Sequence, residues 1–318
     1  MEMTTIAKRN NFFTGLKAKL FRSKYLMIMI LPAVVFYIIF NYIPMYGVIM
    51  AFKAFNPKAG IIGSPWNGVD NFIYIFREEA FWTAFTNTLI IGSVKIVISF
   101  VGAITIALLL NEIRMRRTKK TVQTIVTFPH FLSWVVVAGF VYTIFSSTGI
   151  VNSIIIAFGG DSIKFMLDKK IFFGIVFFSD IWKEAGWGSI IYLATMAGIP
   201  QDQYEAADID GATRLQKIWH ITLPGIKPVA ILLLIMSVGG VLSAGFDQIY
   251  NMTSSLTNSP VMPTVQIIDT LIYQSTFVSR SLSEGQSTAV GLFKSLVGFI
   301  LVITTDRIAK LCGERGII

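Results

Sequence analysis

The sequence predicts an all-α, polytopic membrane protein with six transmembrane helices. Of its 318 residues, 54% are hydrophobic and only 14% are charged, where about 25% charged is typical of soluble domains. Six stretches approach the roughly 20 apolar residues that are needed to cross the hydrocarbon core. None shows the alternating pattern of a membrane β-barrel strand. Since a segment in lipid must satisfy its own backbone hydrogen bonds, each stretch is expected to be a helix.

The predicted spans are distributed along the whole chain. They are Tyr25–Ala51, Ala84–Leu110, Thr121–Ser147, Ile171–Ala197, Ile226–Asp247 and Thr288–Thr305. The first is longer than the apolar stretch of a cleavable signal peptide, and no small-residue cleavage pattern comes after it. We therefore divide the chain into a basic head (1–24), a six-span domain (25–308) and a tail (309–318).

The distribution of lysine and arginine predicts the orientation. Of these 27 residues, 17 lie in the head, the 111–120 loop, the 198–228 segment and the tail, and seven lie in the opposite loops. By the positive-inside rule, both termini are cytoplasmic in a multi-pass protein of the plasma or inner cell membrane. The net charge of +9 then reflects topology, and no nucleic-acid partner is expected. The head is either an interfacial helix in contact with membrane lipid or a simple basic anchor.

The cytoplasmic segment 198–224 departs from a simple bundle. Pro200 suits a first helical position, and the glutamine, glutamate and alanine residues after it favour a short helix. Asp210–Gly211 is expected to end that helix, because glycine tolerates the turn and aspartate can cap the next helix. Ala212–His220 predicts a second short helix, which Pro224 ends as the fifth span begins. The segment is thus a helix–turn–helix across the cytoplasmic mouth.

This segment resembles the EAA loop of ABC importer permeases. Glu205-Ala206-Ala207, Asp210-Gly211-Ala212, and Ile221, Leu223 and Pro224 carry the resemblance, together with a position just before the penultimate span. The resemblance implies the type I ABC importer permease fold, with a coupling helix in a cleft of an ATP-hydrolysing partner. The residues that it assigns to ATPase coupling are Tyr204, Glu205, Ala206, Ala207, Asp210, Gly211, Ala212, Leu223 and Pro224. Within this set, Glu205 would contact or orient ATPase residues, and Ala206 and Ala207 would allow close packing.

Other stretches resemble the carbohydrate-uptake branch of this family, which includes polysaccharide and multiple-sugar permeases. They are Phe40–Gly47, Trp66–Phe72 and Asn87–Leu89, and the overall resemblance runs from about Tyr25 to Lys310. It implies uptake of an oligosaccharide. It also implies three kinds of protein partner: a second, different permease in a heterodimer, two ATP-binding subunits, and an extracytoplasmic solute-binding protein.

The chain lacks the motifs of an enzyme. It contains no G-x-x-x-x-G-K-[ST] phosphate loop, no H-E-x-x-H and no G-x-S-x-G, and it has one cysteine and two histidines. We therefore expect no catalytic residue, no metal site and no cofactor bound by this chain. ATP and Mg would be used by the partner ATPase subunits.

Charged residues inside the spans are candidates for the substrate pathway. Asp180, Lys183 and Glu184 interrupt the fourth span, where each charge costs about 2.5–3.5 kcal/mol on insertion scales. They form either a locally paired set that holds the bundle or, with the Trp187 ring one turn away, part of a sugar path.

Single charges in other spans extend this set. Lys95 and Lys294, with Lys183, make three buried lysines, whose charge would complement an acidic sugar such as a uronate oligomer. Asp247 and Tyr250, at the outer end of the fifth span, are weaker candidates for the mouth of the cavity.

Three alternatives remain open at this level. The same architecture could carry a non-sugar solute. An ion-driven secondary carrier could use the buried charges, although it needs no EAA-type loop and no inverted repeat is visible. An intramembrane enzyme would need a paired catalytic set, and only Asp180 with Glu184 comes near one.

Overall fold

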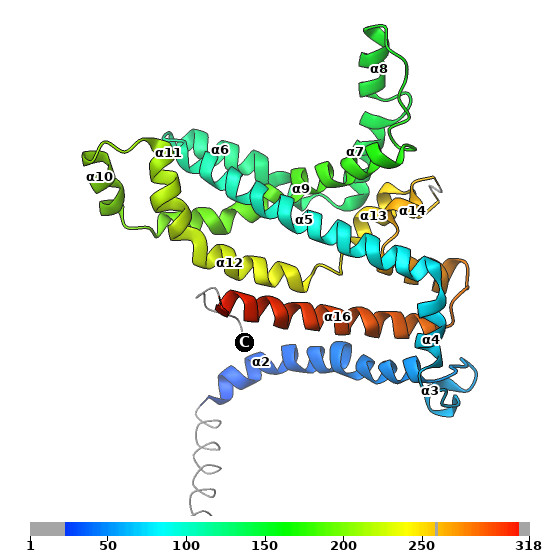
Figure 1. The fold of residues 1–318 in the computed structure, drawn as a ribbon. Helices are drawn as coiled ribbons and strands as arrows, with labels where there is room; N and C mark the ends of the chain where they lie inside the picture. Colours follow the sequence, from blue (N-terminus) through cyan, green and yellow to red (C-terminus); the bar gives the residue numbers. More distant parts are fainter. Residues whose placement is uncertain (1–22, 258–259, 312–318) are drawn as a thin grey trace, which may run out of the picture.

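The computed structural model describes residues 23–257 and 260–311, and this part of the chain is built from helices (Figure 1). Within these ranges, extended pairing is confined to an isolated bridge between Lys53 and Trp66. The all-α class is confirmed. Most of the predicted head and most of the predicted tail lie outside the described residues, and the interfacial-helix hypothesis concerns residues that lie there.

The long helices keep the predicted order of spans. They are α2 (Lys24–Tyr37) with its continuations η1 (Ile38–Tyr42) and η2 (Ile43–Phe52), α5 (Glu79–Glu112), α6 (Arg116–Thr127), α7 (Trp134–Phe145), α9 (Lys169–Ala197), α12 (Leu223–Gly239) and α16 (Glu284–Leu311). The shorter helices are α3 (Gly60–Gly63), α4 (Asp70–Arg77), η3 (Phe128–Phe131), α8 (Ile150–Ala157), α10 (Gln201–Ile209), α11 (Arg214–Lys217), η4 (Ile218–Thr222), α13 (Phe246–Met252), α14 (Met262–Val265), α15 (Ile268–Tyr273) and η5 (Gln274–Val278).

Five helical segments of the described chain have the length and hydropathy of a membrane span. They are Lys24–Phe52, Glu79–Glu112, Trp134–Ala157, Arg214–Gly239 and Glu284–Leu311. The remaining predicted span is α9, which has 29 residues and is long enough to cross. Its middle carries the three charges of the predicted fourth span, which is why its hydropathy is lower. Below, the inner end is the one that charge distribution assigns to the cytoplasm.

The central unit is the pair α5–α9, which makes the largest helix–helix contact in the described chain. Small residues allow the two backbones to approach, since Gly102 faces Ala185 and Gly188 faces Ala103. Outward from this pair, α12 packs against α16, and α16 packs against η2 (Figure 1). No residue of α2 itself is buried, so its apolar surface is free for lipid or another subunit.

The predicted third span is not one helix. The structure ends α6 at Thr127, inserts the short turn η3, and restarts with α7 at Trp134. Pro129 explains the break, because proline supplies no backbone N–H and clashes with the preceding turn. Ser133 then caps α7 by accepting a hydrogen bond from the Val136 N–H.

The boundaries of the predicted fifth span were wrong at both ends. Pro224 does not separate two helices, because residues 214–239 form one continuous helix. The π-helical turn η4 precedes the proline, and the Leu223 N–H bonds the Ile218 carbonyl five residues back, which accommodates the proline without a break. At the outer end, α12 stops at Gly239. Gly245, at φ +94°, then starts the separate helix α13.

Substitution of Gly186 on α9 tests the close contact between α9 and α6. A Cβ on Gly186 would lie 1.9 Å from the Val126 carbonyl oxygen of α6, whereas a Cβ on Gly174 of the same helix would meet nothing within 4 Å. We expect Gly186→Ala to lower the melting temperature of the detergent-solubilised protein, since overpacking costs about 1–3 kcal/mol. Gly174→Ala is the matched control and should be neutral or slightly stabilising. Equal melting temperatures for the two variants would contradict this packing.

Candidate functional site

The inner end of the molecule carries an elbow, defined here as residues 198–224. Its first arm is α10, and its second arm is α11 with η4, which continues into α12. Gly211 makes the turn at φ +76°, a left-handed conformation that glycine adopts without strain. The Ala212 N–H bonds the Ala207 carbonyl and the Gly211 N–H bonds the Asp208 carbonyl. This pattern is a Schellman motif, which satisfies the last carbonyls of α10.

The second arm begins at Thr213, not at Asp210. The Thr213 hydroxyl accepts from the Gln216 N–H, and the Gln216 side chain accepts from the Thr213 N–H, which completes a capping box. The expectation that Asp210 caps this helix was wrong. Asp210 instead closes α10, where its N–H bonds the Ala206 carbonyl.

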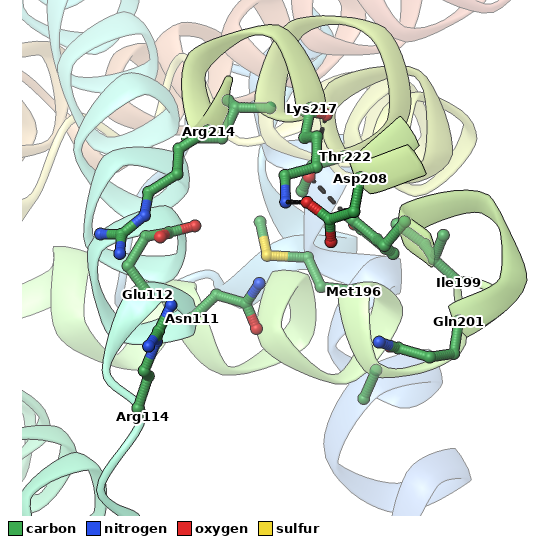
Figure 2. A pocket seen from close by; sticks show the side chains of 13 residues that line it. Asn111, Glu112, Arg114, Met196, Ile199, Gln201, Asp208, Arg214, Lys217 and Thr222 are labelled. Atoms are coloured by element: carbon green, nitrogen blue, oxygen red, sulfur yellow. Dashed lines mark hydrogen bonds and ion pairs between the residues drawn. The ribbon is translucent and has the colours of Figure 1, made fainter. Parts of the chain in front are cut away.

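Two polar contacts cross the elbow. The Tyr204 and Thr222 hydroxyl groups lie 3.0 Å apart, and Lys217 Nζ lies 2.6 Å from Asp208 Oδ1. Behind them is a cavity of about 450 Å³ between the arms and the inner ends of α5 and α9 (Figure 2). Arg114 and Arg214 line it with Glu112, so charged side chains from three elements converge there.

The residues that the EAA resemblance selected fall into two groups by burial. Glu205, Ala206, Asp210, Gly211 and Pro224 are exposed, whereas Tyr204, Ala207, Ala212 and Leu223 are half-buried. Sequence reasoning missed Ile209, the last residue of α10, whose side chain is 86% exposed. With Leu215 and Trp219, also exposed, it adds apolar surface at the elbow. The sequence did contain a signal for Ile209, because an isoleucine at the end of a short polar helix is not part of a buried apolar face.

Lys95 is not alone inside the membrane. Its Nζ lies 3.1 Å from Asp180 Oδ1 and donates to the Ala244 carbonyl at 3.0 Å and to the Gln248 side-chain oxygen. Ser99 also donates to Asp180, at 3.3 Å. This cluster joins α5, α9 and the turn that leads to α13. We call it the buried node.

A second charged cluster lies further along α9. Glu184 lies 3.2 Å from Lys183 Nζ and 2.7 Å from His130 Nδ1, and Lys183 also donates to the His130 carbonyl at 2.6 Å. The Trp187 ring stacks on the His130 ring with centroids 4.5 Å apart. The sequence analysis assigned His130 no role. The helix break at η3 brings His130 next to α9. The sequence contains no signal for the contact between His130 and Glu184.

The third buried lysine is also paired, since Lys294 Nζ lies 2.6 Å from Asp269 Oδ1. Each of the three buried lysines is thus paired by a carboxylate of this chain, which the sequence analysis did not anticipate, and their part in an acidic pathway stays a prediction. Asp247 and Tyr250 belong to α13, where Asp247 is exposed. The Tyr250 ring stacks on Phe246 and meets the Tyr273 ring edge to face. Among the described residues, no cluster of His, Cys, Asp and Glu could hold a metal ion.

A helical membrane bundle with an exposed inner elbow is the architecture that the EAA resemblance implies for a permease subunit of an ABC importer. The family described as "Binding-protein-dependent transport system inner membrane component" matches residues 103–313, and the chain belongs to it. The protein is therefore a transport subunit and not an enzyme. The family resemblance seen in the sequence is confirmed.

Individual relatives match over nearly the full chain. The polygalacturonan/rhamnogalacturonan transport system permease protein YteP of Bacillus subtilis (strain 168) is 43% identical, with 94% of this chain and 92% of the relative covered. Protein LplB of the same strain is 40% identical, with 94% and 93% covered. A solved bacterial ABC transporter involved in the import of the acidic polysaccharide alginate has a chain with a TM-score of 0.83 and 36% identity, with 93% of this chain and 98% of that chain covered.

The buried node gives a prediction on stability. Lys95→Met leaves the Asp180 carboxylate without its cation, and breaking a buried pair costs about 3–5 kcal/mol. The double variant Lys95→Met/Asp180→Leu removes both charges and should recover most of the loss. The measurement is the fraction of monodisperse protein after detergent extraction, together with its melting temperature. A double variant no more stable than Lys95→Met would show that the pair is not what matters at this position.

Proposed function

We propose that this chain is the permease subunit of a binding-protein-dependent ABC importer for acidic oligosaccharides, of the uronate type. Transport by an ABC permease follows from the family; the acidic cargo is the proposal. It is carried by the 43% identity to a polygalacturonan/rhamnogalacturonan permease over 94% of the chain. The likeness to the alginate importer chain, at TM-score 0.83, supports the same class of cargo.

The proposed assembly contains this chain, a second permease, two ATP-binding subunits and a solute-binding protein outside. A related alginate transporter was solved with an alginate pentasaccharide-bound periplasmic protein, which supports the last of these partners. The unburied apolar surface of α2 suits a second permease or lipid. With both termini cytoplasmic, the elbow faces the ATP-binding subunits, which use ATP and Mg.

In this proposal, the exposed side of α10 docks in the ATPase. Glu205 offers a charge, Ala206 allows close approach, and Ile209 offers an apolar anchor, since all three are exposed. ATP-driven closure of the two ATPase subunits moves the elbow and switches the cavity between inward- and outward-facing states. ATP can shift that equilibrium only by binding the two states with different affinity.

The sugar path would run beside the two charged clusters. Trp187 is 45% exposed and stands beside Glu184, so a ring face and a polar group are available to a pyranose. Lys183 and His130 both contact Glu184 and hold its carboxylate in place. Because the lysines are paired, we assign the choice of an acidic cargo mainly to the solute-binding protein.

A reconstituted system tests the function. The tagged chain should co-purify from gently solubilised native membranes with an ATPase, a second permease and a solute-binding lipoprotein. In vesicles, this complex should take up an oligogalacturonide only with ATP, and a neutral oligosaccharide of equal length much less. Uptake of the neutral sugar alone would overturn the acidic cargo. Uptake driven by an ion gradient without ATP would instead favour a secondary carrier.

Gly211 provides a test of coupling. A Cβ there would meet nothing within 4 Å, so any effect of substitution comes from the backbone at φ +76°. A β-branched side chain in this conformation costs about 1–2 kcal/mol or more. We expect Gly211→Val to insert normally but to lower uptake relative to ATP hydrolysis. Gly211→Asn is the control, because asparagine tolerates the left-handed region. Normal uptake by Gly211→Val would count against the turn as a coupling element.

A further inference from the structure

The two arms of the elbow lie antiparallel and touch at three levels. Nearest the membrane, a Cβ on Gly225 would lie 2.6 Å from Ile199 Cδ1, so the chain entering α10 packs on the start of α12. At the next level the Tyr204 hydroxyl meets the Thr222 hydroxyl at 3.0 Å. Furthest out, Asp208 meets Lys217 at 2.6 Å. From one contact to the next, the residue number rises by four or five on the first arm and falls by three to five on the second arm, as expected for two antiparallel segments.

The π-helical turn η4 creates this register. In a regular α-helix, residues five apart point about 140° away from each other. Lys217 and Thr222 are five apart, yet both face α10, because a π turn bonds residue i to i+5. The Thr222 hydroxyl, on a residue only 2% exposed, reaches both the Lys217 carbonyl at 3.5 Å and the Tyr204 hydroxyl. The π turn thus aligns two polar groups with the inner side of α10.

Tyr204 and Asp208 consequently use their polar ends within the chain. Both contact the second arm, and both line the cavity seen in Figure 2. Glu205, Ala206 and Ile209 are exposed and do not line that cavity. α10 therefore separates its roles by side: one set of residues is free for a partner, and another holds the helix in place.

The turn itself offers no lateral support. A Cβ on Gly211 would have no neighbour within 4 Å, so the turn is not packed against other parts of the chain. If the arms were not tied, a force on α10 would bend the elbow at this glycine. The second arm, in contrast, is part of a continuous helix from Arg214 to Gly239. A force that reaches this helix is carried into the membrane.

We infer that Tyr204 and Asp208 are positioning residues that brace α10 against the 214–239 helix. They make the elbow move as one body, so that displacement of α10 moves the transmembrane helix and is not lost by bending at Gly211. This inference rests on the proposed function, because it takes the ATPase as the source of the force. It reassigns Tyr204, which the EAA resemblance places among the residues that couple to the ATPase, from partner contact to internal brace.

The test uses the reconstituted complex and three variants: Tyr204→Phe, Asp208→Asn and the double variant. Tyr204→Phe keeps the ring and removes only the hydroxyl. The control is Gln203→Ala, an exposed residue of α10 whose helical position lies away from both brace residues and from the face of Glu205, Ala206 and Ile209. For each protein, three quantities are measured: the amount of co-purified ATPase, the rate of ATP hydrolysis stimulated by the binding protein, and oligosaccharide uptake.

We expect every variant to retain the ATPase and to hydrolyse ATP. Uptake per ATP should fall about fivefold in Tyr204→Phe, the factor that corresponds to one net hydrogen bond. It should fall less in Asp208→Asn, because the Asp208 side chain is 62% exposed and its pair is screened by solvent. It should fall most in the double variant and stay unchanged in Gln203→Ala. The exchange Asp208→Lys/Lys217→Asp should restore the ratio lost in Asp208→Asn.

The contrary outcomes are distinct. An unchanged ratio in the double variant would overturn the brace and leave the importer intact. Loss of the ATPase from Tyr204→Phe, with retention in Gln203→Ala, would also overturn it, since Tyr204 would then be a partner contact. Failure of the unmodified chain to bind any ATPase would instead contradict the proposed function. In that case the brace, as a device of coupling, is overturned with it.

Discussion

The ion pair between Lys95 and Asp180 joins the two central helices at a depth where neither charge is stable alone. Around it, Gln248 donates to the Val176 carbonyl at 2.7 Å and to the Ser179 hydroxyl at 3.0 Å, so the polar groups of the node are satisfied together. α5, α9 and the turn after α12 must therefore keep one relative placement. The outer helices pack around this unit in order: α16 packs against α12, and η2 packs against α16.

The position of α12 depends on that unit and on the elbow. Its outer end leads through Gly245 to the buried node, where the Ala244 carbonyl accepts from Lys95. Its inner end is continuous with the second arm of the elbow. One helix therefore connects the surface that faces the ATPase, in our proposal, with the charged centre of the bundle. The non-helical stretch between these two places is the short turn 240–245, whose Ala244 carbonyl is itself held by Lys95.

Much of this could be predicted from the sequence, and the failures have physical causes. Hydropathy and charge located the helices, and the turn at Gly211 was readable because glycine adopts the left-handed conformation without strain and so marks the end of a helix. The π turn before Pro224 was not readable, since it depends on how the 214–239 helix packs against α10. The pairing of Lys294 with Asp269, 25 residues apart, depends on tertiary placement in the same way.

The neutralised lysines change where selectivity should be sought. A charge that is paired within the chain presents little net potential to a passing uronate, because its field is cancelled by a carboxylate about 3 Å away. The inner surface of this subunit is then suited to let an oligosaccharide pass and not to hold it. That suits a permease, because a tight site along the path would slow release on the far side. In our proposal, the cargo is selected before entry, in the solute-binding protein, where tight binding does not oppose passage.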